Sequence, residues 1–127
     1  MKHAANYENV TSITLFAAVA VIAIYRAVVL TDDGASEYPE AGGDVDNISM
    51  APTTYIGEAF QGAQPTGAKV KIEAGAPVAI NDLVAADAEG RAVPAEAGDT
   101  VIGKAVTAAG AIGEVIAIMF TPKGTAA

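Results

Sequence analysis

The stretch Ala74–Gly98, AGAPVAINDLVAADAEGRAVPAEAG, decides the fold because this chain contains it twice. Its counterpart begins 56 residues earlier, at Ala18–Gly42, and reads AVAVIAIYRAVVLTDDGASEYPEAG. The two stretches align without a gap, with identities at Ala18/Ala74, Ala20/Ala76, Ala23/Ala79, Ile24/Ile80, Val28/Val84, Gly34/Gly90, Glu40/Glu96, Ala41/Ala97 and Gly42/Gly98. A duplication of this size indicates two similar supersecondary units that complete one core.

A second set of matches follows at a shorter spacing. Ile56-Gly57, with Ala59 and Gly67, matches Ile102-Gly103, with Ala105 and Gly113, at an offset of 46. This alignment predicts ten extra residues in the first copy, within Gly43–Thr54. We expect an extended arm at residues 1–12 and a single β domain at residues 13–127, with repeat one at about 18–72 and repeat two at about 74–120.

Each copy contains a turn signal between two β-prone segments. Asp32-Asp33-Gly34 and Ala88-Glu89-Gly90 are such signals, and glycine supplies the positive φ that a tight turn needs. The predicted hairpins join Ala27–Thr31 to Ala35–Tyr38, and Leu83–Asp87 to Arg91–Pro94. Further strands are expected at Val19–Ile24, Tyr55–Phe60, Lys69–Ile72, Val101–Thr107 and Val115–Phe120.

These segments predict an all-β fold, a small sandwich or barrel built from two similar β-hairpin-containing repeats, with an extended N-terminal arm. An amphipathic helix over Ala17–Val28 is the competing interpretation, since alanine favours helix, but β-branched residues favour strand. Glycines at turns and bulges make up the signature of the repeat: Gly34, Gly42, Gly57, Gly67, Gly90, Gly98, Gly103 and Gly113.

Composition narrows the classes of function. Fifteen acidic residues against seven basic ones give a net charge of −8, which opposes nucleic-acid binding. The apolar fraction is 52% but the aromatic fraction only 6%, so small side chains fill the core and assembly would add stability. Arg26 interrupts the apolar run Ile13–Leu30, so we expect no membrane span. A cleaved signal peptide is the other interpretation of that run.

The residue types that carry chemistry are sparse. Cysteine is absent, and the only histidine, His3, lies in the arm, so no metal site is expected. Asp44-Val45-Asp46-Asn47 begins like a calcium loop but lacks its later glycine and glutamate. No nucleophile elbow or phosphate loop occurs. We therefore expect no enzyme activity, no catalytic, cofactor-binding or metal residues, and no cofactor. A biotinyl or lipoyl carrier domain is a further alternative, but the expected hairpin tips carry no lysine.

The second copy carries a motif with a family resemblance. The turn Asn81-Asp82-Leu83-Val84 is followed by Asp87-Ala88-Glu89-Gly90-Arg91-Ala92-Val93-Pro94-Ala95 and by Val101-Ile102-Gly103-Lys104-Ala105. This series resembles the small two-repeat Ala/Gly-rich capsid cement (decoration) proteins of tailed bacteriophages. The resemblance covers about Ala18–Phe120 and rests on structural turns.

The resemblance implies a non-enzymatic structural protein of the virion. Such proteins bind the outer capsid surface, often as trimers, and stabilise it by clamping neighbouring major capsid subunits. It implies a homo-oligomer, made in the host bacterial cytoplasm, whose partner is the major capsid protein and which binds neither nucleic acid nor membrane. We expect the arm, from Met1 to about Leu15, to lie across neighbouring subunits, with contact residues Lys2, His3, Tyr7 and Glu8.

Two other functions remain open at the level of sequence. One is a different phage head or tail structural component, such as the base of a head fibre. The other is a secreted bacterial β-rich binding module, in which the first apolar segment acts as a signal.

Overall fold

The computed structural model describes residues 10–18, 20–31 and 35–125, and every regular element within these ranges is a strand. The predicted all-β fold is confirmed. The strands are β1 (Ser12–Ala17), β2 (Ala27–Leu30), β3 (Ala35–Glu37), β4 (Asn47–Ser49), β5 (Ala59–Ala63), β6 (Lys69–Glu73), β7 (Leu83–Ala86), β8 (Ala92–Pro94), β9 (Thr100–Ala105) and β10 (Val115–Thr125).

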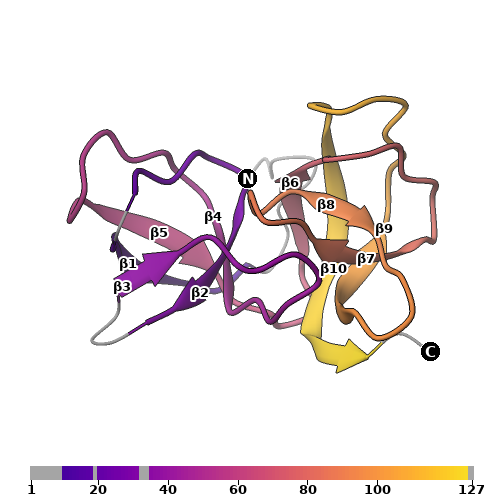
Figure 1. Cartoon of the computed structure of the whole chain (residues 1–127), viewed down its shortest axis with the longest axis horizontal. Coiled ribbons are helices and arrows are strands. Elements are labelled where there is room, and N and C mark those ends of the chain that lie inside the picture. The colour runs from indigo at the N-terminus through magenta and orange to yellow at the C-terminus, as the bar shows by residue number, and fades with distance from the viewer. Residues whose placement is uncertain (1–9, 19, 32–34, 126–127) are drawn as a thin grey trace, which may run out of the picture.

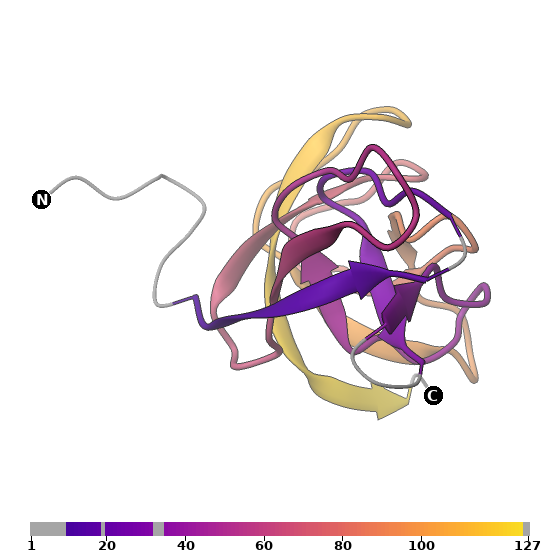
Figure 2. The ribbon, with the colours of Figure 1, turned by 90° about the vertical axis from the view of Figure 1, so that its left-hand side faces the viewer.

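The strands form two units that lie side by side (Figure 1). In the first unit, residues 12–63, the strands close into a barrel in the order β1-β3-β2-β4-β5. In the second unit, residues 69–125, they form a sheet in the order β6-β10-β9-β7-β8. A parallel bridge between Ala74 and Ala92 joins the two ends of that sheet. Figure 2 looks onto the first unit, with β1 in front.

The two units have the same strand pairing, displaced by 56 residues. Ala27 lies opposite Ile48 in the first unit, and Leu83 lies opposite Lys104 in the second. The pair Ile48 and Ala63 likewise recurs as Lys104 and Met119. The offset therefore continues through β4 and β5, and the prediction of ten extra residues in the first copy was wrong.

The error came from matching Ile56-Gly57 with Ile102-Gly103. Their true counterparts are Ile112-Gly113, because Gly57 and Gly113 have φ of 90° and 94° and lie in equivalent turns. Gly57 donates to the carbonyl of Ala17 at 2.7 Å, and Gly113 to that of Ala74 at 2.9 Å. Gly103 instead lies within β9, where a Cβ would overlap the carbonyl oxygen of Met119.

The hairpin predictions are confirmed, since β2 pairs antiparallel with β3, and β7 with β8. The predicted strand Tyr55–Phe60 is wrong, because residues 55–57 form a turn and β5 begins at Ala59. The strand predicted at Val19–Ile24 is also wrong over its described part. There the amide of Ile22 donates to the Thr53 hydroxyl at 2.7 Å, so a side chain replaces the ladder partner of a strand.

The arm is shorter than the expected Met1 to about Leu15. Leu15 belongs to β1, lies opposite Phe60 of β5 and is 1% exposed, so it is part of the barrel. Residues 1–9 lie outside the described part of the chain.

Two hydrophobic clusters support the fold. The smaller lies inside the first unit and is built entirely from its residues: Leu15, Ala17, Ile22, Val28 and Phe60. The larger contains the interior of the second unit together with Ala27, Val45, Ile48 and Ala63 of the first. The units therefore share a core. Within the described residues, no helix has the length and hydropathy needed to cross a membrane.

Candidate interaction surfaces

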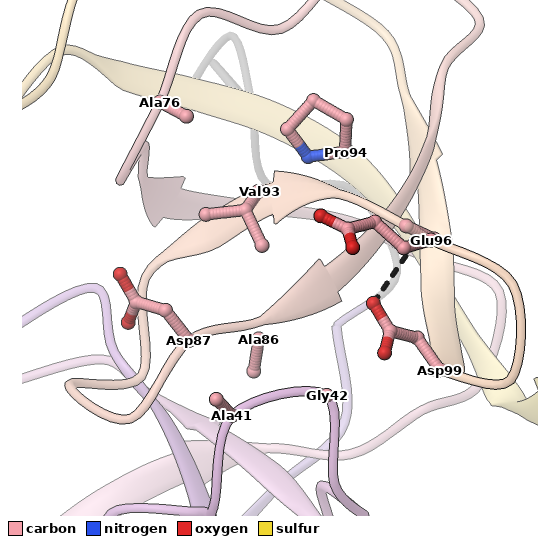
Figure 3. A pocket seen from close by; sticks show the side chains of 10 residues that line it. Ala41, Gly42, Ala76, Ala86, Asp87, Val93, Pro94, Glu96 and Asp99 are labelled. Atoms are coloured by element: carbon pink, nitrogen blue, oxygen red, sulfur yellow. Dashed lines mark hydrogen bonds between the residues drawn. The ribbon is translucent and has the colours of Figure 1, made fainter.

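A cleft of about 460 Å³ lies where the two units meet (Figure 3). Its lining residues are Ala41 and Gly42 from the first unit, and Ala76, Ala86, Asp87, Val93, Pro94, Ala95, Glu96 and Asp99 from the second. They include no serine, threonine, histidine or lysine that could act as a nucleophile or base. The cleft therefore offers an apolar floor with carboxylates at its rim.

Two of these carboxylates stabilise local turns. Asp87 accepts the backbone amides of Glu89 and Arg91, both at 2.9 Å, and forms an ion pair with the Arg91 guanidinium at 3.1 Å. Asp99 accepts the amide of Glu96 at 2.9 Å. Within the described ranges, no group of three or more His, Cys, Asp or Glu side chains could hold a metal ion.

Backbone hydrogen bonds join the two units beside the cleft. Gly42 donates to the carbonyl of Ala86 at 2.8 Å and accepts from the amide of Thr100 at 3.0 Å. Ala27 donates to the carbonyl of Gly90 at 2.7 Å. A Cβ at Gly90 would overlap the Ala27 carbonyl oxygen, and its φ of 77° also favours glycine.

Arg26 connects the units from the first side. Its Nη2 forms an ion pair with Glu73 Oε2 at 3.1 Å, and its Nη1 donates to the carbonyl of Glu89, also at 3.1 Å. The side chains of Arg26 and Glu73 are both mostly buried, and Lys71 Nζ lies 5.8 Å from the ring centroid of the neighbouring Tyr25. The junction is therefore held by polar contacts as well as by the shared core.

The outer faces of the two barrel walls differ in what covers them. In the first unit, Ala27, Ile48 and Ala63 lie in one row across β2, β4 and β5 and are fully buried in the shared core. Their equivalents, Leu83, Lys104 and Met119, form the same row across β7, β9 and β10. Leu83 is 52% exposed, Met119 is 45% exposed and Lys104 is exposed. The second unit therefore leaves open the face that the first unit uses for packing.

Two equivalent turns each present an isoleucine to solvent. Ile56 is 59% exposed and Ile112 is 63% exposed. In each turn a glutamate closes the backbone: Glu58 accepts the amide of Thr54 at 2.6 Å, and Glu114 accepts that of Gly110 at 3.0 Å. The hydrogen bonds from the Thr54 amide and hydroxyl lower the pKa of Glu58, and that from the Tyr55 amide adds to the effect.

The predicted site residues fall in different places. Lys2, His3, Tyr7, Glu8 and Gly34 lie outside the described residues. The other signature glycines lie in turns with positive φ, except Gly103 in β9. Sequence reasoning missed the exposed turns, although Ile56-Gly57-Glu58 and Ile112-Gly113-Glu114 are identical and 56 residues apart. The glutamate would have identified the correct match.

Comparison with known proteins gives one informative likeness. The fold is similar to that in the crystal structure of the head fiber gp8.5 N base in bacteriophage phi29, with a TM-score of 0.71 and 22% sequence identity. The similarity covers 88% of this chain and 94% of that one. No protein-family model matches the chain, and no curated protein sequence matches it. At this level of identity, the likeness concerns the fold.

Proposed function

We propose that this protein is a structural component of a bacteriophage head that binds the outer surface of the capsid. The observation that carries the proposal is the fold, which is similar over 88% of the chain to a head fiber base. The motif around Asp87-Ala88-Glu89-Gly90-Arg91 independently resembles capsid cement proteins. The two likenesses come from different features, backbone topology and local sequence, and agree on a protein of the phage head.

Within this role we propose a clamp rather than a catalyst. The units share one core and are joined by the Arg26–Glu73 ion pair and by the backbone bonds of Gly42, so the chain is suited to act as a rigid body. A rigid body with more than one contact can hold neighbouring major capsid subunits together. We propose no catalytic role, no cofactor and no nucleic-acid or membrane partner.

The test uses phage shells assembled without this protein. Purified protein added to such shells should sediment with them, and electron cryomicroscopy should show density on the outer surface. Shells carrying the protein should resist heating better than bare shells. Absence of binding would overturn the head assignment, whereas binding without a gain in thermal resistance would overturn only the clamp and favour the base of an external appendage.

The proposed assembly also includes self-association, with the trimer as the form that the family resemblance implies. The open face around Leu83, Lys104 and Met119 favours a second copy of this chain as its occupant. Lys69 and Lys71 lie on the same side of the sheet, so this face carries three of the seven basic residues of a chain with net charge −8. Another copy supplies the complementary acidic surface.

Sedimentation of variants tests this face. The substitution Leu83→Glu should convert an oligomer to a monomer, because it places negative charge within the apolar row. Val21→Glu is the matched control, since Val21 is 47% exposed and lies in the first unit. A monomeric wild-type protein, or an oligomer unaffected by Leu83→Glu, would contradict the assignment.

A further inference from the structure

The identical turns Ile56-Gly57-Glu58 and Ile112-Gly113-Glu114 stand out in a part of the repeat that has otherwise diverged. From position 43 to position 68, the only residues identical to the residue 56 positions later are Val45 and these three. Even the barrel interior differs, with Phe60 and Gly62 in the first unit where the second has Ile116 and Ile118.

The fold accounts for two of the three identical residues. Gly57 and Gly113 have φ near 90°, a conformation that side chains with a Cβ rarely adopt. Glu58 and Glu114 accept the backbone amide four residues earlier and so close the turn. The isoleucines make no comparable contribution, because more than half of each side chain is exposed to solvent. Packing within the chain therefore does not explain them.

The two turns also lie on one side of the molecule. The segments that contain them, residues 50–58 and 106–114, both lie along the upper side in Figure 1, one on each unit. They are again in the upper part of the molecule in Figure 2, which is turned by 90°. A surface approached from that side can meet both turns.

We propose that Ile56 and Ile112 form a two-point docking device that inserts into two copies of one apolar pocket on the capsid. This inference rests on the proposed function and names the contact residues for it. Two identical tips call for a partner with two identical pockets, and a shell of identical subunits provides them. Because Glu58 and Glu114 are engaged within their own turns, the contact is apolar rather than ionic.

Two linked contacts bind more tightly than either does alone, because the second forms at high effective concentration once the first is made. Removing one isoleucine side chain should weaken binding to shells about 10- to 100-fold, as expected when one buried aliphatic side chain is lost. Removing both should weaken it by roughly the product of the two effects.

The experiment measures binding of Ile56→Ser, Ile112→Ser and the double variant to shells that lack the protein. Ile80→Ser is the matched control, because Ile80 is 58% exposed but lies outside both turns. Circular dichroism and sedimentation establish that each variant is folded and keeps the wild-type oligomeric state. The expected result is a similar loss for the two single variants, a larger loss for the double variant, and control binding within about twofold of wild type.

Several outcomes would overturn the inference. They are wild-type binding by all variants, a loss confined to one of the two positions, an equal loss for Ile80→Ser, or a change of oligomeric state in place of a change in shell binding. In each of these cases binding by the wild-type protein leaves the proposed function standing. If the wild-type protein does not bind shells, the proposed function and this inference fail together.

Discussion

The two units of this chain have one backbone plan and different side-chain contents. The first closes around Leu15 and Phe60, and at Gly62 a Cβ would collide with Leu15. The second places Ile118 at the position of Gly62 and completes its core with residues from its neighbour. The comparison teaches that turns and hydrogen bonds preserve the fold, while side-chain volume moves between positions as long as the interior stays filled.

The largest test of this comparison is Ile118→Asp. Ile118 is fully buried in the shared core, so the variant must bury an unpaired charge, which costs several kcal/mol against a total stability of about 5–15 kcal/mol. We expect loss of the folded state in circular dichroism and NMR spectra. Met119→Asp is the control, because the adjacent side chain is 45% exposed and should tolerate the charge. A folded Ile118→Asp protein would show that the second core is not closed as described.

Gly90→Ala sharpens the description of the junction. The new Cβ would press against the Ala27 backbone and force the units apart. Gly98→Ala separates this effect from backbone strain, because Gly98 has a φ of 89° but a Cβ there would have no neighbouring atom within 4 Å. We expect Gly98→Ala to cost about 1–2 kcal/mol, and Gly90→Ala about 1–3 kcal/mol more. Urea denaturation measures both, and equal losses would mean that the contact between units is not tight.

Arg26→Ala tests the polar part of the junction. It removes the ion pair with Glu73 and the hydrogen bond to the Glu89 carbonyl, so we expect a loss of about 1–3 kcal/mol. Lys104→Ala serves as the comparison in thermal unfolding, because an exposed lysine on the open face should contribute less than about 0.5 kcal/mol. A similar small effect for both would leave the shared apolar core as the only important contact between the units.

The smallest expected effect concerns pH and the first docking turn. The pKa of Glu58 is lowered by its hydrogen bonds with Thr54, so the folded turn favours the charged carboxylate. Its contribution to stability is present above the pKa of the unfolded chain and is lost as the pH falls through the lower folded value. The amide signals of Thr54 and Tyr55 should therefore shift together in acid, and Glu58→Gln should abolish that shift. An unchanged titration in Glu58→Gln would assign it to another group.

The hairpins were predictable because their signals are local. Asp87 accepts amides from the next few residues and Gly90 has the positive φ that the turn needs, so the motif Asp-Ala-Glu-Gly-Arg determines its own shape. The segment near Ile22 was not predictable, because its amide is satisfied by Thr53, 31 residues away. Propensity cannot register such a partner.

The candidate surfaces depended even more on tertiary structure. Nothing in the local sequence distinguishes buried Ile48 from exposed Ile56, because the second unit covers only the first of them. The repeat itself could have revealed the docking turns if its offset of 56 had been followed past Gly42. The predicted arm contacts at Lys2, His3, Tyr7 and Glu8 stay a prediction.

The division of the hydrophobic clusters has a consequence for biosynthesis. The cluster of Leu15, Ala17, Ile22, Val28 and Phe60 needs nothing from later in the chain, whereas the second cluster needs Ala27, Val45, Ile48 and Ala63. A ribosome delivers the self-sufficient part first. The nascent chain can thus fold its early half during translation and use that half as a template for the rest.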